Sequence, residues 1–476
     1  MGGQFWGYFQ IPNNPGQSTF AGISAINGVP ISAYNSANLN ELQLESSQFG
    51  AISFLHSEKD FDFQVSVISK YSWLQYYPDT SLGDLAFNGI SENAARTSWA
   101  NNLQAEGTYR LTTDHTLRGG LLFSGEHVTS NTHSNVLDQI GTDSFGNPIF
   151  ATTTTPIASS SDKTSFSYSA YLQDEWKALD ALTVNYGARF DLVNGYTMGS
   201  QFSPRLNTVW KATPSTTLHA GYARYFTPPP QELVSTENVV LYANTSGAAA
   251  SPENSPLKNE SANYFDVGMT QDVLTGLKVG VDLYYKKSSN LLDESQFGAP
   301  IILTPFNYRL AINKGVELTA NYNVGNFTFY GNLAIANQLA KGIDSAQFNF
   351  TPEQLLSADS MFVNTDHSQL KTESAGVAYL WNGTRFTADM VAGSGLRTVE
   401  PTNLVFNGGT VPSYQQVNLG ISHVFASAPG GPVTVRLAVI NLLDKIYLLR
   451  SMTGVGEFSN QFGPRRSVYA GLKKEF

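Results

Sequence analysis

The residues best suited to act on a ligand are charged side chains within segments that alternate between polar and apolar positions. They occupy the polar positions of these segments, and they are Arg189, Asp191, Lys278, Asp282, Glu317 and Arg436. If the segments are strands around a lumen, these side chains point inward, where they can contact an internal domain or steer a solute. The alternative is that each is a solvated wall residue that pairs with another wall residue.

The sequence contains no recognisable catalytic or metal-binding grouping. Its 7 histidines are scattered, and His127 and His133 lie near Glu126 at a spacing that does not suit a metal site. The chain has no cysteine, which excludes a thiol nucleophile and a metal–thiolate site. We therefore expect no enzyme activity, no catalytic residue, no cofactor and no metal. A hydrolase assembled from Asp, His and Ser side chains inside a lumen stays as an alternative.

The elements that must position the charged side chains are strands. Residues 182–192 alternate apolar side chains with Thr183, Asn185, Gly187, Arg189 and Asp191. A period of two gives a β-strand with one apolar and one polar face. At about eleven residues, the run is long enough for a tilted strand to cross a bilayer. Residues 166–173, 202–210 and 218–226 follow the same plan, so the sequence predicts a series of transmembrane strands.

Every second connection between these segments is a tight turn, and those in between are mostly long. The turns are expected near Lys59, Thr113, Leu179, Pro214, Thr275, Gly325, Gly383 and Gly430. Long loops are expected at residues 130–163, 227–261, 291–308, 341–370, 393–412 and 442–463, with a short helix starting at Thr351. Short turns on one side and long loops on the other are typical of outer-membrane barrels, whose turns are periplasmic and whose loops are extracellular.

We therefore predict an all-β fold, an antiparallel transmembrane β-barrel with about 17–18 strands present. Loops on a rigid scaffold usually carry recognition, so substrate contacts are expected on the long loops. The substrate-binding residues themselves stay unknown. Trp176, Trp210 and Trp381 fall at the turn-side ends of strands, where amphipathic rings form a girdle at the membrane interface.

The composition agrees with strands that face lipid. Charged residues make up only 14% of the 476 residues, against about 25% in soluble domains. No apolar stretch reaches the roughly 18 residues that a membrane helix needs. The net charge of −10 argues against a nucleic-acid partner. A large soluble β-sandwich or propeller, which would fold in buffer without detergent, is the alternative fold.

The first residues lack an export signal. Residues 1–20 have neither a basic region nor an apolar core, as a secretory signal peptide would. Because a strand-built membrane protein must be exported, we expect that the natural N-terminus is missing. We divide the chain into residues 1–40, a loop-rich remnant of an early barrel segment, and residues 41–476, the β-barrel.

Several motifs resemble those of TonB-dependent receptors. The hairpin formed by YLQDEW (171–176) and LTVNYGARFD (182–191) resembles the mid-barrel hairpin of that family, and FSPRL (202–206), GYARYFTPP (221–229) and KGVEL (314–318) are similar to later strands. NLLDKIY (441–447) and FGPRR (462–466) resemble the closing segment. The resemblance covers about residues 40–476 and depends on the order and spacing of these motifs.

The resemblance implies a 22-stranded barrel in the bacterial cell outer membrane, filled by an N-terminal plug and driven by the TonB complex. Members of the family import siderophores, vitamins or carbohydrates. We therefore expect a receptor and transporter for TonB-dependent uptake of a scarce nutrient, here as a truncated barrel. The plug and the first four or five strands have no counterpart in this chain, so coupling to TonB is expected only if a plug is supplied. The alternatives are a passive porin-like channel and a non-functional barrel fragment.

The expected partners are outer-membrane lipid, the barrel-assembly machinery, the TonB complex under that condition, and a small-molecule nutrient. We expect a monomer. Phe476 ends an alternating strand and resembles the signal that the assembly machinery reads. Lys474 stands at a position of this signal that is usually apolar.

Overall fold

The computed structural model describes residues 2–9, 22–35, 38, 40–233, 239–296, 303–398, 406–450 and 460–474. For residues 2–9, 296 and 303 it describes the backbone alone. Phe476, the predicted assembly signal, lies outside the described residues.

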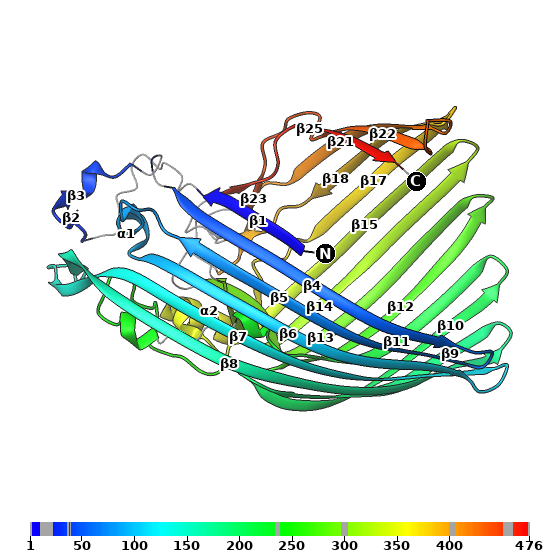
Figure 1. The fold of residues 1–476 in the computed structure, drawn as a ribbon, viewed down its shortest axis with the longest axis horizontal. Coiled ribbons are helices and arrows are strands. Elements are labelled where there is room, and N and C mark those ends of the chain that lie inside the picture. The colour runs from blue at the N-terminus through cyan, green and yellow to red at the C-terminus, as the bar shows by residue number, and fades with distance from the viewer. Residues whose placement is uncertain are drawn as a thin grey trace.

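Antiparallel strands of one 19-stranded sheet make up most of the fold (Figure 1). The strands of the first half are β1 (Gly2–Phe9), β4 (Glu41–Ser57), β5 (Phe61–Tyr77), β6 (Ser91–Arg110), β7 (His115–Thr142), β8 (Pro148–Leu179), β9 (Leu182–Asn194), β10 (Met198–Thr213), β11 (Thr216–Thr227) and β12 (Glu260–Leu274). Those of the second half are β13 (Leu277–Gln296), β14 (Leu303–Val324), β15 (Phe327–Ile343), β16 (Val363–Asn364), β17 (Lys371–Trp381), β18 (Thr384–Gly393), β21 (Tyr414–Phe425), β22 (Val433–Ile440) and β25 (Ser467–Lys474).

The remaining elements are short and lie in the connections. The strand pairs are β2 (Ala25–Ile26) with β3 (Val29–Pro30), β19 (Arg397–Thr398) with β20 (Gly409–Thr410), and β23 (Leu448–Arg450) with β24 (Gln461–Phe462). The α-helices are α1 (Gly83–Asn88) and α2 (Pro352–Ser360), and the 3₁₀ turns are Ile31–Ala33, Gln231–Leu233, Val239–Tyr242 and Gln347–Asn349. No helix in the described part of the chain is long and apolar enough to cross a membrane.

The strands follow one another around the sheet in chain order. Each strand from β4 to β15 pairs with the next, and the order continues through β17, β18, β21, β22 and β25. β1 pairs with β4, and the two-residue β16 adds only to the outer end of β15. Among the described residues, no ladder joins β25 to β1. Without the two-residue β16, the sheet has 18 strands. That count agrees with the predicted 17–18, and the antiparallel order agrees with the predicted barrel.

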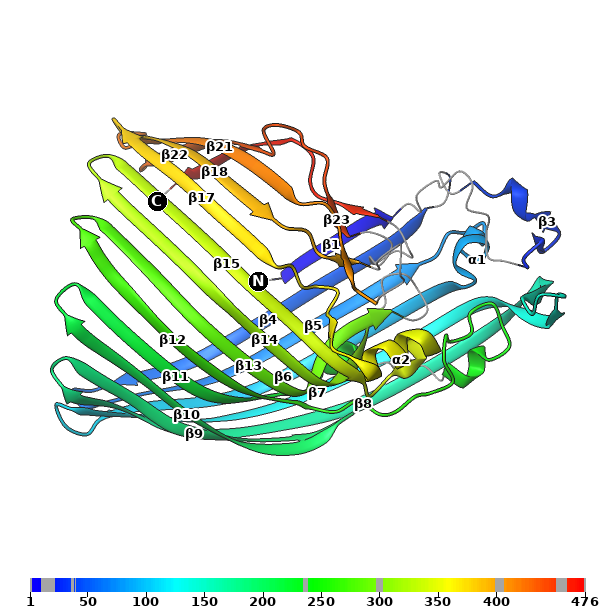
Figure 2. The ribbon, with the colours of Figure 1, turned by 180° about the vertical axis from the view of Figure 1, so that it is seen from behind.

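The tight turns gather at one end of the sheet and the long connections at the other (Figures 1 and 2). All eight predicted turns are present between the strands expected to flank them. One is the pair Asn382 and Gly383, with φ of 45° and 76°. Two successive positive φ values are typical of the type I′ turn that suits the twist of a hairpin, and Asn-Gly is its preferred sequence. We call these two ends of the sheet the turn side and the loop side.

Two of the predicted loops are wrong. Residues 130–163 belong mainly to β7 and β8, which form a hairpin that runs far past the other strands and turns at residues 143–147. Residues 291–308 likewise extend β13 and β14. Beyond the lipid, strands need no apolar face, so alternation disappears while pairing continues. The Thr-rich residues 152–155 favour extended backbone.

The predicted helix in the loop after β15 is confirmed. Thr351 caps α2, because its hydroxyl accepts a hydrogen bond from the backbone N–H of Gln354 at 3.3 Å. The Gln354 side chain accepts the backbone N–H of Thr351 at 2.9 Å in return. This reciprocal capping box, followed by Pro352, fixes the start of the helix.

The predicted domain boundary at residue 40 stays a prediction. Residues 1–40 contain β1, which pairs with β4, and the small hairpin of β2 and β3.

At the other end of the sheet, Lys474 shares a face with Val468 and Leu472. Its ammonium donates to the carbonyl of Pro429 in the turn between β21 and β22, at 2.5 Å. The charge therefore lies at the turn-side rim, where a long side chain can leave the apolar face.

Candidate functional site

The six charged residues predicted to point inward share one face of the sheet. In an antiparallel ladder, residues directly opposite each other point to the same face. Asp191 lies opposite Gln201, Asp282 opposite Glu317, and Arg436 opposite Ser422. The pairs that connect these strands keep the same parity. We call this face the polar face and its opposite the apolar face.

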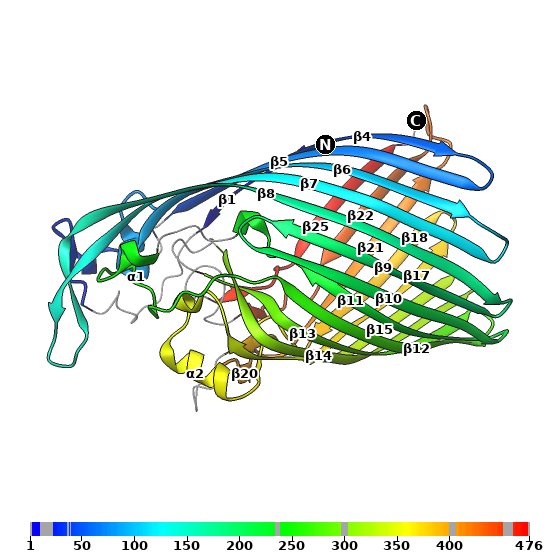
Figure 3. The same ribbon diagram turned by 90° about the horizontal axis from the view of Figure 1, so that it is seen from below.

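The polar face is the sheltered side of the curved sheet. On neighbouring strands, Asp191 and Ser203 of the polar face are 8% and 3% exposed, whereas Phe190 and Phe202 of the apolar face are 48% and 61% exposed. Figure 3 shows β8 to β11 as one wall in front of the wall formed by β17 to β25. The pattern is that of a barrel whose large apolar side chains face lipid and whose polar side chains face a lumen.

The tryptophans expected at the turn-side rim agree with this assignment. Trp176, Trp210 and Trp381 lie within the last residues of β8, β10 and β17. The register puts all three on the apolar face, where they are 39%, 50% and 55% exposed. They form part of an aromatic girdle at the turn side.

Arg189 and Asp191 belong to a hydrogen-bonded group on β8 and β9. Arg189 Nε lies 2.7 Å from Asp191 Oδ1, and an Arg189 Nη donates to Ser169 Oγ at 2.8 Å. The Ser169 hydroxyl donates to the same carboxylate at 2.6 Å. The Asp191 charge is thus compensated within the wall.

Asp282 is engaged by a histidine that the sequence did not single out. His219 Nε2 on β11 lies 2.7 Å from Asp282 Oδ1 on β13 and 3.6 Å from Asp266 Oδ2 on β12. Gly268, which lies directly between the strands of His219 and Asp282, has no side chain and leaves room for this contact. His219 and Asp266 each occupy a polar position of an alternating strand, and this pattern could have identified both residues from the sequence.

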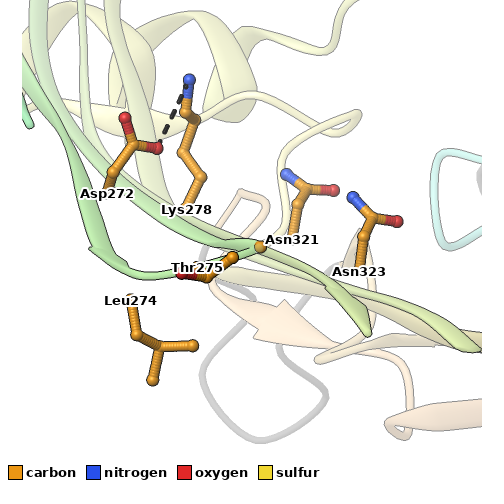
Figure 4. Close-up of a pocket in the computed structure, with 7 residues that line it drawn as sticks. Asp272, Leu274, Thr275, Lys278, Asn321 and Asn323 are labelled. Atoms are coloured by element: carbon orange, nitrogen blue, oxygen red, sulfur yellow. Dashed lines mark ion pairs between the residues drawn. The ribbon is translucent and has the colours of Figure 1, made fainter. Parts of the chain in front are cut away.

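Lys278 lies at the turn-side end of the polar face. Its ammonium is 3.6 Å from Asp272 Oδ1, and both side chains are more than half exposed, so the pair adds little stability. Together with Asn321 and Asn323 they line a pocket of about 650 Å³ beside the turn between β12 and β13 (Figure 4).

Glu317 and Arg436 differ from the other four residues. Both are exposed on the polar face, and no ion pair within the described residues includes either of them. They lie on β14 and β22. The other four predicted residues all take part in ion pairs.

A second group of charges lies at the loop side, where β13 ends. His367 Nδ1 is 2.5 Å from Asp366 Oδ1 and 3.6 Å from Asp293 Oδ1, and an Arg450 Nη is 3.5 Å from Asp366 Oδ2. The hydrogen bonds to Asp293 and then Asp366 raise the pKa of His367 to about 9. Burial raises the pKa of Asp293. The three ligand atoms lie within 4.8 Å of one another, and the two cations balance the two carboxylates.

Sequence reasoning did not find this loop-side group. Its members come from the end of β13, the connection between β16 and β17, and β23, so only loop packing brings them together. His127 and His133, whose spacing in the sequence does not suit a metal site, lie on β7. His127 contacts Thr164 and Asp162 instead.

The fold and the two faces define the class of protein. A curved antiparallel sheet with an apolar outer face, a polar inner face, turns at one end and long loops at the other is an outer-membrane β-barrel.

Comparison with known proteins agrees. Residues 2–442 match the family described as TonB dependent receptor-like, beta-barrel. The chain therefore belongs to the TonB-dependent receptor-like β-barrel family and is a protein of the outer membrane.

Individual relatives are distant in sequence. The probable TonB-dependent siderophore receptor PirA of Acinetobacter baumannii is 24% identical over 339 residues, which are 65% of this chain and 42% of that protein. The iron-regulated outer membrane virulence protein of Vibrio cholerae is 21% identical over 297 residues, 62% of this chain and 43% of that protein. The chain thus spans less than half the length of these relatives.

Solved structures show the same fold. The ferric yersiniabactin uptake receptor FyuA of Yersinia pestis superposes with a TM-score of 0.67 at 11% identity, covering 96% of this chain and 64% of that one.

Proposed function

We propose that the chain forms the barrel wall of a receptor that takes up a scarce nutrient across the outer membrane, with a metal chelate of the siderophore class as its ligand. The observation that carries the proposal is the family match over residues 2–442. It is supported by two relatives, one described as a siderophore receptor and one as iron-regulated. The activity is binding followed by gated passage, and no bond in the ligand is broken.

The polar face is the surface along which a plug or a solute would lie. Four of the six predicted lumen residues compensate their charges within the wall or at its rim, which favours a rigid, water-filled interior. Glu317 and Arg436, which no ion pair among the described residues includes, carry charges of opposite sign on different strands. We assign them the contact with a plug segment or a passing solute, because uncompensated charges in a lumen act on charged partners over several ångströms.

The remaining partners follow from the same assignment. The apolar face, with Trp176, Trp210 and Trp381 at its rim, would contact outer-membrane lipid. Coupling to TonB would act through a plug inside the barrel. The barrel-assembly machinery would insert the chain, and we propose that it acts as a monomer.

Ligand binding tests the proposal. The purified chain in detergent would be titrated with ferric complexes of catecholate, hydroxamate and citrate-type chelators, following quenching of its tryptophan fluorescence, with the metal-free chelators as controls. We expect one ferric class to bind saturably and its metal-free form to bind more weakly. Absence of binding, together with steady ion conductance in a planar bilayer, would instead support the passive porin-like channel.

A further inference from the structure

A carboxylate lies on the apolar face of the sheet, near the turn side. Asp174 of β8 lies directly opposite Leu117 of β7 and Tyr186 of β9. It is two residues from Trp176, which is on the same face. The three strands lie side by side (Figure 1). A charged side chain on a face toward lipid is costly unless it has partners.

Asp174 is only 6% exposed and has partners on both neighbouring strands. His115 Nδ1 of β7 lies 2.6 Å from Asp174 Oδ2, and the Tyr186 hydroxyl donates to the same oxygen at 3.0 Å. The second oxygen, Oδ1, is buried and receives no hydrogen bond. Buried carboxylate oxygens normally have partners, and each exception needs an explanation. The carboxylate can therefore accept a further donor at Oδ1.

Aromatic rings lie beside this carboxylate. The His115 and Trp176 rings are stacked, with centroids 5.8 Å apart and planes at 6° to each other. Trp176 and Tyr186 are 39% and 44% exposed, so both rings are open to a molecule at the surface of the sheet. The faces of Trp and Tyr rings attract cations. We call the residues Asp174, His115, Trp176 and Tyr186 the Asp174 group.

We propose that the Asp174 group binds the ammonium headgroup of a phospholipid of the phosphatidylethanolamine type. The ammonium would donate a hydrogen bond to Asp174 Oδ1 and lie against the rings of Trp176 and Tyr186. Hydrogen bonds between charged groups are about twice as strong as neutral ones. Because exposed side chains change rotamer within nanoseconds, the headgroup can reach the buried oxygen when an exposed ring turns.

The position of the group favours a lipid over a soluble amine. Trp176 belongs to the aromatic girdle at the turn side. Asp174 lies two residues further into the membrane, or about 5 Å at about 3.3 Å per residue and a tilt of about 40°. On the same face, Leu172 and Leu206 are 62% and 47% exposed and offer apolar surface to the acyl chains. Turns of outer-membrane barrels are periplasmic, so the lipid would belong to the periplasmic leaflet.

Glu175, the next residue of β8, provides the contrast. It lies on the polar face opposite Asn185, and an Arg118 Nη donates to its Oε2 at 2.9 Å. The charge of Glu175 is therefore compensated within the wall, away from lipid. Glu175→Gln removes a negative charge one residue from Asp174 and is a matched control for Asp174→Asn. The inference depends on the membrane location of the sheet and not on the nutrient proposed above.

Native mass spectrometry of the full chain in detergent tests the proposal. The chain would be titrated with phosphatidylethanolamine and, separately, with phosphatidylglycerol of the same acyl chains, which has no ammonium. For the unmodified chain we expect a single phosphatidylethanolamine to bind saturably, at least about five-fold more tightly than phosphatidylglycerol, as for one net hydrogen bond. Asp174→Asn should remove this preference, and Glu175→Gln should keep it. Trp176→Leu, which removes a ring but keeps the carboxylate, should weaken phosphatidylethanolamine binding about two- to five-fold.

Two results would overturn the inference. The first is that the unmodified chain binds the two lipids equally, which would leave the Asp174 group as a contact that only joins β7, β8 and β9. The second is that Asp174→Asn retains the preference for phosphatidylethanolamine. If Asp174→Asn fails to fold, Trp176→Leu decides, and unchanged phosphatidylethanolamine binding in that variant would then overturn the inference.

Discussion

An arginine introduced at Val281 should impair assembly far more than one introduced at Thr319. Val281 lies on the apolar face of β13, opposite Met269 and Leu318. Thr319 lies on the polar face of β14, opposite Gly280. The two positions are therefore at nearly the same depth in the membrane but on opposite faces of the sheet, which makes Thr319→Arg a matched control for Val281→Arg.

The expected size of the effect follows from the depth of Val281. It is the fifth residue of β13, which begins at Leu277. At about 3.3 Å per residue and a tilt of about 40°, it lies about 10 Å above the turn-side end of the strand. The apolar band of such barrels is about 25 Å tall, and arginine near its middle costs about 2–4 kcal/mol. That free energy corresponds to about a 30-fold to several hundred-fold change in the folding equilibrium.

The assay is urea-dependent folding into lipid vesicles, with the folded fraction read from heat-modifiable migration on a gel. Val281→Arg should lower the unfolding free energy by about 2–4 kcal/mol, and Thr319→Arg should lower it by less than about 1 kcal/mol. Gly280 is a poorer control, because a Cβ there would meet Thr319 Oγ1 at 2.6 Å. Equal losses from both variants would refute the assignment of the two faces.

Three further predictions concern the loop side and the closing segment. In the folded protein the pKa of His367 is about 9, above the ordinary histidine value of 6.5. Its ion pairs therefore stabilise the loop fully below pH 6.5 and are lost as the pH rises through about 9. Hydrogen exchange of residues 363–371 should show this loss, and His367→Gln should remove it. Asn441 is fully buried and bonds Lys445 and Pro464 through its side chain, so Asn441→Ala should lower the unfolding free energy in urea by about 2–4 kcal/mol; an unchanged midpoint would contradict that role. Deleting Phe476 should slow insertion by the assembly machinery, measured as the fraction of heat-modifiable protein in the outer membrane, with Glu58→Gln at a turn as a control that should insert normally.

The membrane-facing half of the fold could be predicted from the sequence because lipid imposes a strict pattern. Residues 182–192 were expected as a strand, and β9 spans Leu182–Asn194. Alternation there is enforced because every second side chain contacts hydrocarbon. The tight turns carry equally clear local signals, such as Asn382-Gly383.

The loop side could not be predicted in the same way. The hairpin of β7 and β8 beyond the membrane has polar side chains on both faces, so nothing in its pattern separates strand from loop. The group around His367 is brought together by the packing of connections. Its members carry no local spacing that would mark them as neighbours.

The polar face was predicted in part. Parity along each strand was sufficient to identify Arg189, Asp282 and Glu317 as residues of one face. Which of their charges are compensated by a partner depends on the register between strands. His219 is a partner of Asp282 only because of that register. Sequence patterns show on which face of the sheet a residue lies, whereas its partner can be identified only from the observed pairing of the strands.

The absence of cysteine in the chain allows the most direct test of the central claim, that the sheet spans the membrane with its polar face inward. Single cysteines would be placed at Leu318 and at Glu317, adjacent residues on opposite faces of β14, and labelled with an environment-sensitive fluorophore in lipid vesicles. The structure predicts that the label at 318 is quenched by bromine-labelled lipid and the label at 317 by aqueous iodide. The same quenching at both positions, or the reverse assignment, would contradict it.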